Sequence, residues 1–261
     1  MKKTFSQKHP YTSIILLGLL CTFMTALGTA IPQIIGFDID LQLVITTVFL
    51  IISIAIGIFI MKKSRFTIPD YGFQKSTKDS YKKVWWYIPL LAIEIIPIAI
   101  AGFSSKVTVQ QYFILLFFTV AVGFNEEIYF RGLAIKVMEE KGQKKAIIGS
   151  SILFGVLHLV NALNGKNILY LVLQMILAFL VGFVLAEIVS ITKSLWIVII
   201  WHAAHDYIAS ITSDTLDTTA LIVLAIQVVI LLIYAIFIWK RCSIEDTNTL
   251  CIDDKPNIEA D

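Results

Sequence analysis

Residues 41–61 read LQLVITTVFLIISIAIGIFIM, a mostly apolar run without a single charged side chain. About 20 such residues in a helix cross the roughly 30 Å hydrocarbon core of a bilayer. Seven other segments of the chain match this run in length and apolar content or come close to it. We therefore expect membrane-spanning helices at residues 11–31, 41–61, 84–103, 110–133, 145–162, 168–189, 195–211 and 218–239.

The composition of the whole chain supports a membrane protein. Of its 261 residues, 57% are hydrophobic and 15% are charged, and the mean hydropathy is +0.82. Soluble domains average roughly 45–50% apolar and 25% charged residues, so a soluble fold is excluded. Helices are expected because backbone polar groups in lipid must be satisfied within their own segment, and the alternating pattern of a barrel is absent. The predicted fold class is all-α, a polytopic membrane helix bundle of about eight transmembrane helices.

The positions of the basic residues predict the orientation. Lys and Arg accumulate on the cytoplasmic side of membrane proteins. With Arg131 set aside as intramembrane or interfacial, one side of the predicted topology holds 18 of them and the other holds only Lys106 and Lys166. Both termini are therefore expected in the cytoplasm, for a multi-pass protein of the cell membrane whose surroundings are the lipid bilayer. The net charge of +2 gives no reason to expect a nucleic-acid partner.

The predicted bundle covers residues 1–242, and residues 243–261 form a polar, acidic tail on the cytoplasmic side. The first span has an alternative interpretation. It follows Lys2 and Lys3 and contains the small residues Gly28 and Ala30, a pattern also found before signal-peptide cleavage. Its apolar run is longer than the 7–15 residues of an ordinary signal peptide, which favours a retained helix.

Ionisable residues are concentrated in three of the predicted spans, where each charge costs about 2.5–3.5 kcal/mol on insertion scales. The fourth span contains the sequence NEEIYFR at residues 125–131, the fifth contains FGVLH at 154–158, and the seventh contains HAAHD at 202–206. Residues that are expensive to bury are retained for function or for a structural pair. These three motifs are therefore the candidate functional site.

Helical spacing suggests how these residues divide their roles. Glu127 and Arg131 are four residues apart, so they can pair and partly neutralise each other. Glu126 points about 100° away around the helix and remains a free carboxylate. At about 1.5 Å per residue, Glu126 lies roughly 24 Å from the outer end of its span, in the cytoplasmic half. The same estimate places His158 and His202 at depths compatible with one pocket that opens toward the cytoplasm.

Two chemistries fit this pocket. Glu126 can act as a general base on a water molecule while the imidazoles stabilise the developing oxyanion. Alternatively, Glu126, His158 and His202 can hold a divalent metal that activates the water, with zinc as the expected ion.

The three motifs resemble the pattern E-E-x-x-x-R, F-x-x-x-H, H-x-x-x-[N/D] of the CAAX prenyl protease and bacteriocin-processing (CPBP, or Abi) family of intramembrane peptidases. The resemblance covers about residues 110–211, the predicted peptidase core. It implies that Glu126 activates water, that His158 and His202 are site histidines, and that Asp206 is their polar partner. It also implies a structural role for Glu127 with Arg131. Where some members have Asn, this chain has Asp206, which favours a metal-binding or His-orienting role over an amide that donates to an oxyanion.

Four further polar or aromatic residues lie within or near the spans. Phe154 is expected to shape the substrate pocket. Glu94, beside Pro97, either lines that pocket or bonds a backbone group freed by the proline. His205 is expected to be a local packing or hydrogen-bonding residue. Glu187 is expected to reach the membrane interface.

The predicted function is an intramembrane endopeptidase that cleaves a membrane-associated peptide or protein. A prenylated CAAX protein, a bacteriocin or pheromone precursor, and a membrane regulator are the candidate substrates. One alternative is a non-catalytic bacteriocin-immunity or signalling scaffold on the same fold, but a scaffold has no need for costly buried charges. Another is an ion-coupled transporter, against which the chain shows no inverted repeat.

Overall fold

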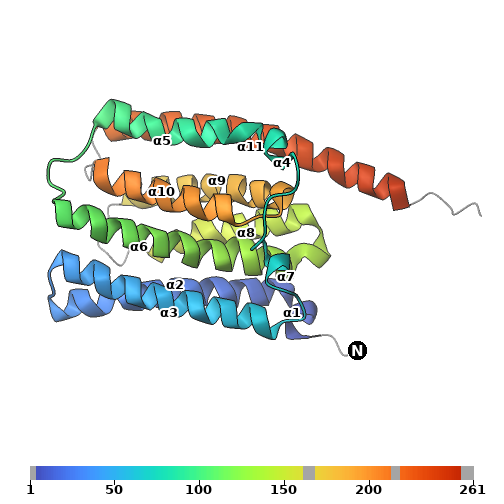
Figure 1. Ribbon diagram of the computed structural model, residues 1–261, viewed down its shortest axis with the longest axis horizontal. Coiled ribbons are helices and arrows are strands. Elements are labelled where there is room, and N and C mark those ends of the chain that lie inside the picture. Colours follow the sequence, from blue (N-terminus) through green and yellow to red (C-terminus); the bar gives the residue numbers. More distant parts are fainter. Residues whose placement is uncertain (1–3, 161–167, 213–217, 254–261) are drawn as a thin grey trace, which may run out of the picture.

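The computed structural model describes residues 4–160, 168–212 and 218–253, and this part of the chain is mostly helical and contains no strands (Figure 1). The prediction of an all-α, polytopic bundle is confirmed. Short elements join the long helices and lie mainly between α3 and α5 and between α6 and α8. The elements in order are α1 (Phe5–Lys8), α2 (Pro10–Ile35), α3 (Ile39–Lys63), η1 (Pro69–Tyr71), α4 (Ser80–Lys83), η2 (Trp85–Tyr87), α5 (Ile88–Ala101), α6 (Val109–Glu127), the π-helical η3 (Ile128–Ala134), α7 (Ile135–Met138), η4 (Glu139–Lys141), α8 (Gln143–Leu157), α9 (Ile168–Thr192), α10 (Trp196–Thr212) and α11 (Thr218–Asp253).

Each of the eight predicted spans corresponds to one main helix of the bundle, but these helices differ in length. Within the described residues, five helical stretches are long and apolar enough to cross a membrane, and α5 is a shorter apolar helix. Helices α8 and α10 have only 15 and 17 residues, below the roughly 20 needed for a full crossing. Eight full spans are therefore not confirmed. Helix α11 continues to Asp253, so the first part of the predicted polar tail extends the last helix, and the rest lies outside the described residues.

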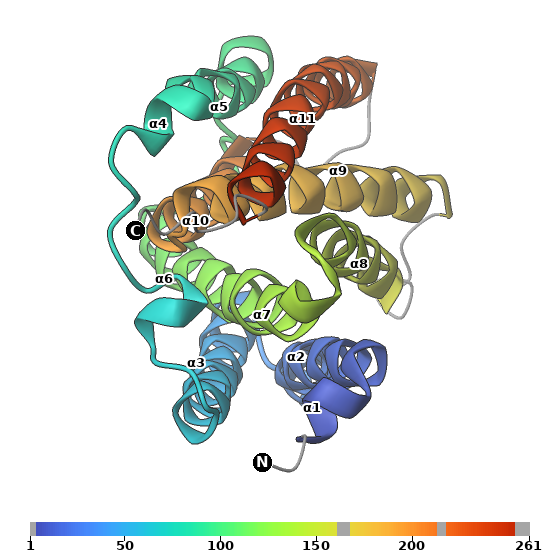
Figure 2. The ribbon, with the colours of Figure 1, turned by 90° about the vertical axis from the view of Figure 1, so that its right-hand side faces the viewer.

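The helices pack as successive layers (Figure 2). Helices α2 and α3 form one side, α6 with η3 lies in the middle, and α8, α9 and α10 follow, with α5 and α11 on the far side. The largest apolar core joins α9, α10 and α11 and includes Val184, Leu195 and Leu231, all fully buried. A second core around Tyr129 and Phe154 joins α2 and α3 to the central layer.

Two local features fix helix α6 in its position. At its start, Thr108 accepts a hydrogen bond from the backbone N–H of Gln111 and its own N–H donates to the Gln111 side chain, a capping box. Near its end, Gly123 lies against the backbone of α10: a Cβ atom there would be 3.0 Å from the carbonyl oxygen of Ile199 and 3.1 Å from the nitrogen of Ala203. The missing side chain lets α6 and α10 approach closely just before Glu126.

All helix ends that the prediction placed in the cytoplasm lie at one end of the bundle. Figure 1 shows the start of α2, the segment between α3 and α5, α7, and the end of α11 on the right, and the α5–α6 connection on the left.

We expect a fluorescent reporter fused after residue 240 to be active in the cytoplasm, because positive residues are retained on that side. An alkaline phosphatase reporter inserted between α5 and α6 should be active outside the cytoplasm. The opposite pair of activities would overturn the predicted orientation.

Candidate active site

The carboxylate of Glu127, at the end of α6, holds two partners at once. Arg131 Nη1 donates to Glu127 Oε1 over 2.9 Å, as the spacing of four residues predicts. His202 Nδ1, on α10, lies 2.7 Å from the same oxygen. The side chains of Glu127 and Arg131 are 0% exposed and that of His202 is 5% exposed. The predicted ion pair is present, and its contact with His202 is a feature that the sequence analysis missed.

This contact determines how His202 faces the rest of the site. A carboxylate accepts hydrogen bonds, so we assign the proton on Nδ1 to the bond with Glu127. The other ring nitrogen, Nε2, then faces Glu126 and Asp206, whose nearest carboxylate oxygens are 3.5 Å and 3.7 Å away. The structure therefore brings together Glu126, His202 and Asp206, which are predicted site residues from two helices.

His158 is oriented in the same manner by a backbone group. Its Nδ1 lies 2.8 Å from the carbonyl oxygen of Phe154, which can only accept, so Nδ1 carries the proton and Nε2 is left free. His158 directly follows the last residue of α8, and the Phe154 carbonyl belongs to the final turn of that helix. Carbonyls in the last turn lack helical partners, and the imidazole satisfies this one.

The ring of Phe154 lies at the centre of these groups. Its centroid is 4.6 Å from that of His158 and 6.0 Å from that of His202, and the Arg131 guanidinium carbon lies 4.2 Å above it. Such a contact between an aromatic face and a cation is attractive, especially where water is excluded. Phe154 therefore covers the Arg131 guanidinium and, with His158, lines both cavities of the site.

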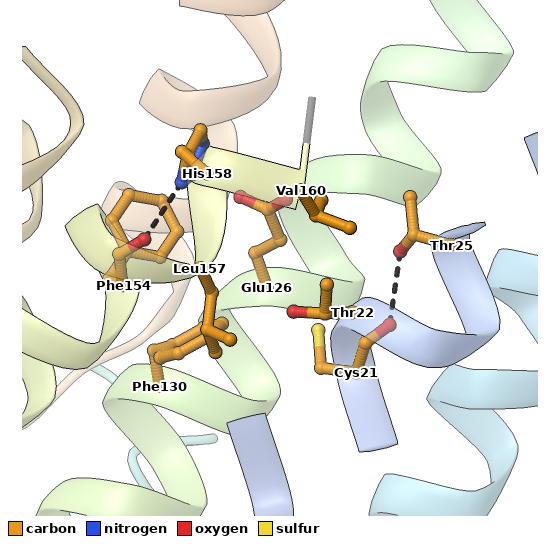
Figure 3. A pocket seen from close by; sticks show the side chains of 9 residues that line it. All are labelled: Cys21, Thr22, Thr25, Glu126, Phe130, Phe154, Leu157, His158 and Val160. Carbon is orange, nitrogen blue, oxygen red and sulfur yellow. Dashed lines mark hydrogen bonds between the residues drawn. The ribbon is translucent and has the colours of Figure 1, made fainter. Parts of the chain in front are cut away.

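Two cavities meet at His158 and Phe154. The smaller, about 70 Å³, is drawn in Figure 3 and contains Glu126 and His158 together with three residues of α2. The larger, about 310 Å³, has His158, His202, His205 and Asp206 in a mostly apolar wall formed by α8, α9, α10 and α11. The catalytic candidates thus lie between a small cavity with a mixed polar and apolar lining and a large, mostly apolar one.

Glu94 and His205 form a second acid–imidazole pair. His205 Nδ1 lies 3.0 Å from Glu94 Oε1, and the His205 ring stacks on Trp201 with centroids 5.0 Å apart. Both residues of the pair line a cavity of about 170 Å³ that shares residues with the 310 Å³ cavity. Glu94 therefore lines a cavity next to the larger one, and its role toward a substrate stays a prediction. His205 both stacks on Trp201 and contacts a polar partner, in keeping with its expected packing or hydrogen-bonding role.

Glu187 does not reach the membrane interface. Glu187 is fully buried, and within the described part of the chain neither of its carboxylate oxygens makes a hydrogen bond. The expectation of an interfacial position is wrong because α9 is covered at this level by its neighbours in the large apolar core. Glu187 does not line any of the three cavities described above.

Two of the predicted metal ligands, His158 and His202, are oriented as zinc-binding imidazoles usually are. The free Nε2 atoms of His158 and His202, each with Nδ1 bonded elsewhere, are typical of metal-ligating imidazoles. In the described residues, however, no three His, Cys, Asp or Glu side chains are spaced so that they could hold one ion. Zinc therefore stays a prediction, and the chemistry below is derived from the side chains alone.

Residues 108–208, which contain all three motifs, match the family described as type II CAAX prenyl endopeptidase Rce1-like. The predicted resemblance to CAAX proteases is confirmed. The match of this segment to a CAAX protease family indicates an intramembrane endopeptidase with a membrane-associated substrate. No curated protein gives a match to the chain. Helix α2, whose residues line the smaller cavity, lies outside the matched segment.

The buried Glu127–Arg131 pair gives a prediction for stability. Glu127→Ala or Arg131→Ala leaves one buried charge without its partner, which costs about 3–5 kcal/mol. We expect each single variant to accumulate less in the membrane, and the double variant to lose less than the sum of the two. Peptidase activity should not return in the double variant, because His202 has also lost its acceptor.

The measurement is membrane abundance and thermal unfolding in detergent, followed by activity at equal protein amounts. Lys136→Ala serves as the control, because its ion pair with Glu139 is at the surface, where such pairs contribute little. Normal accumulation of both single variants would contradict a structural role for the pair.

Proposed function

We propose that the protein is an intramembrane endopeptidase in which Glu126 activates water for attack on a peptide carbonyl. The observation that carries this proposal is the 70 Å³ cavity, which contains the Glu126 carboxylate and His158 and has room for more than one water molecule. The Glu126 side chain is 18% exposed, so it is accessible from the cavity while remaining largely shielded. A shielded carboxylate beside water is suited to general-base catalysis.

The proposed reaction begins when Glu126 takes a proton from the water and the water oxygen bonds to the scissile carbonyl carbon. A protonated Nε2 on His202 donates to the oxyanion that forms, and the carboxylates of Glu127 and Asp206 balance the imidazolium charge. Glu126 then gives its proton to the leaving nitrogen as the carbon–nitrogen bond breaks. The products are one carboxylic acid and one amine, and the carboxylate of Glu126 is regenerated.

The substrate of this reaction would occupy the large apolar cavity. Its walls combine apolar residues of α9 and α11 with His202 and Asp206 of α10. An apolar peptide segment entering from the bilayer or its cytoplasmic face suits such walls. Prenylated CAAX proteins, bacteriocin or pheromone precursors, and membrane regulators are the proposed substrate classes, with peptide maturation or bacteriocin self-immunity as the biological role.

Glu126→Gln tests the proposal. Gln keeps the shape and polarity of the side chain but cannot take a proton from water, so we expect cleavage to fall at least 100-fold with normal membrane abundance. A quenched farnesylated CAAX peptide, assayed with protein in liposomes, is the first reporter. His158→Ala and His202→Ala should be comparably severe, and adding either to Glu126→Gln should cost little more, since the groups act as one unit.

Glu187→Gln is the matched control. It removes a fully buried carboxylate from the same bundle, away from the cavities, and should leave cleavage unchanged. Full function of Glu126→Gln, whether measured as cleavage or as a cellular phenotype, would overturn the peptidase proposal in favour of the scaffold.

A further inference from the structure

Helix α2 supplies one wall of the cavity that contains Glu126. Cys21, Thr22 and Thr25 of α2 face Glu126 across it (Figure 3). These residues lie outside the segment that matches the protease family. The catalytic water of the proposed function would therefore be enclosed partly by a helix that the family motifs do not include.

The hydroxyl of Thr22 differs from those of the other threonines on this face of α2. Thr25 donates to the carbonyl oxygen of Cys21 over 3.1 Å, and Thr29 donates to that of Thr25 over 3.0 Å. Thr22 makes no such bond to the preceding turn, and in the described structure its hydroxyl has no hydrogen-bond partner. In Figure 3 the hydroxyl oxygen of Thr22 is turned toward the inside of the pocket, on the side of Glu126.

The other groups around the cavity cannot replace this hydroxyl. Cys21 Sγ already accepts from Asn125 Nδ2 at 3.2 Å, and Phe130, Leu157 and Val160 are apolar. Ionised Glu126 can only accept hydrogen bonds, and so can the unprotonated Nε2 of His158. A bound water needs two to four polar partners. It can donate its two protons to Glu126 and His158, and the donors left for its oxygen are the Thr22 hydroxyl and the much weaker Cys21 thiol.

We propose that Thr22 is a positioning residue that donates a hydrogen bond to the water activated by Glu126. This inference rests on the proposed function. One lone pair of the water oxygen accepts from Thr22, which leaves the other aimed at the substrate carbonyl while Glu126 takes a proton. The proposal also requires that α2 stays in the mature protein, because cleavage near Ala30 would remove Thr22 from the site.

Thr22→Val tests the role, because Val keeps the branched shape and removes only the hydroxyl. We expect kcat for the farnesylated reporter peptide to fall about tenfold, as for the loss of one hydrogen bond, with KM unchanged. Thr22→Ser restores the hydroxyl and should restore kcat. Thr29→Val, a matched change on α2 whose hydroxyl bonds only its own helix, should behave like the unmodified protein. Full kcat in Thr22→Val, or equal losses in Thr22→Val and Thr22→Ser, would overturn the proposal.

A spectroscopic measurement separates this proposal from the peptidase function itself. In nanodiscs, the infrared band of the Glu126 carboxyl group is identified by its loss in Glu126→Gln. We expect Thr22→Val to shift this band because the water bonded to Glu126 is displaced, and Thr22→Ser and Thr29→Val to leave it in place. An unshifted band in Thr22→Val would overturn the role of Thr22 even if no peptide is cleaved. Absence of cleavage by the unmodified protein, with the shift present, would contradict only the peptidase function.

Discussion

The burial of the Glu127 carboxylate is the constraint on which the rest of the site depends. A charge removed from water is tolerated only when it is paired and hydrogen-bonded. Arg131 supplies the opposite charge from the next turn, and His202 supplies a second donor from another helix. One oxygen atom thus links the central helix to α10. The stability of the bundle and the orientation of the site imidazole are consequences of the same pair of hydrogen bonds.

Two features of the backbone in and after α6 support these contacts. Helix α6 continues into the π-helical segment η3 without a break, and every residue of η3 is buried. A π-helical stretch inside an α-helix often marks a functional site, since the wider turn changes the direction of the side chains that follow. Gly123 lets α10 approach to backbone contact one turn earlier. Together these two features determine which face of α6 meets His202, and so leave Glu126 directed at the cavities.

The sequence predicted those parts of the structure that depend on neighbours along one helix. Apolar run lengths gave the helical class, and the spacing of four residues gave the Glu127–Arg131 pair. The contact of Glu127 with His202 could not be predicted. The two residues are 75 residues apart in sequence, and their contact depends on how their helices are rotated against each other. The pairing of Glu94 with His205 across 111 residues was missed for the same reason. The count of eight full spans is not confirmed, because the apolar runs at α8 and α10 form helices of only 15 and 17 residues.

The end of helix α8 places His158 in the wall of the smaller cavity. Helix α8 rises about 22 Å over its 15 residues, and residues 158–160 follow it as a 3-10 turn. Where an α-helix passes into another conformation, carbonyl groups lose their helical partners, and inside a membrane these are tolerated only where protein or a water-filled cavity satisfies them. His158 satisfies one such carbonyl, that of Phe154, with its own ring. The same bond therefore fixes the imidazole with Nε2 free, in the wall of the cavity that also contains Glu126.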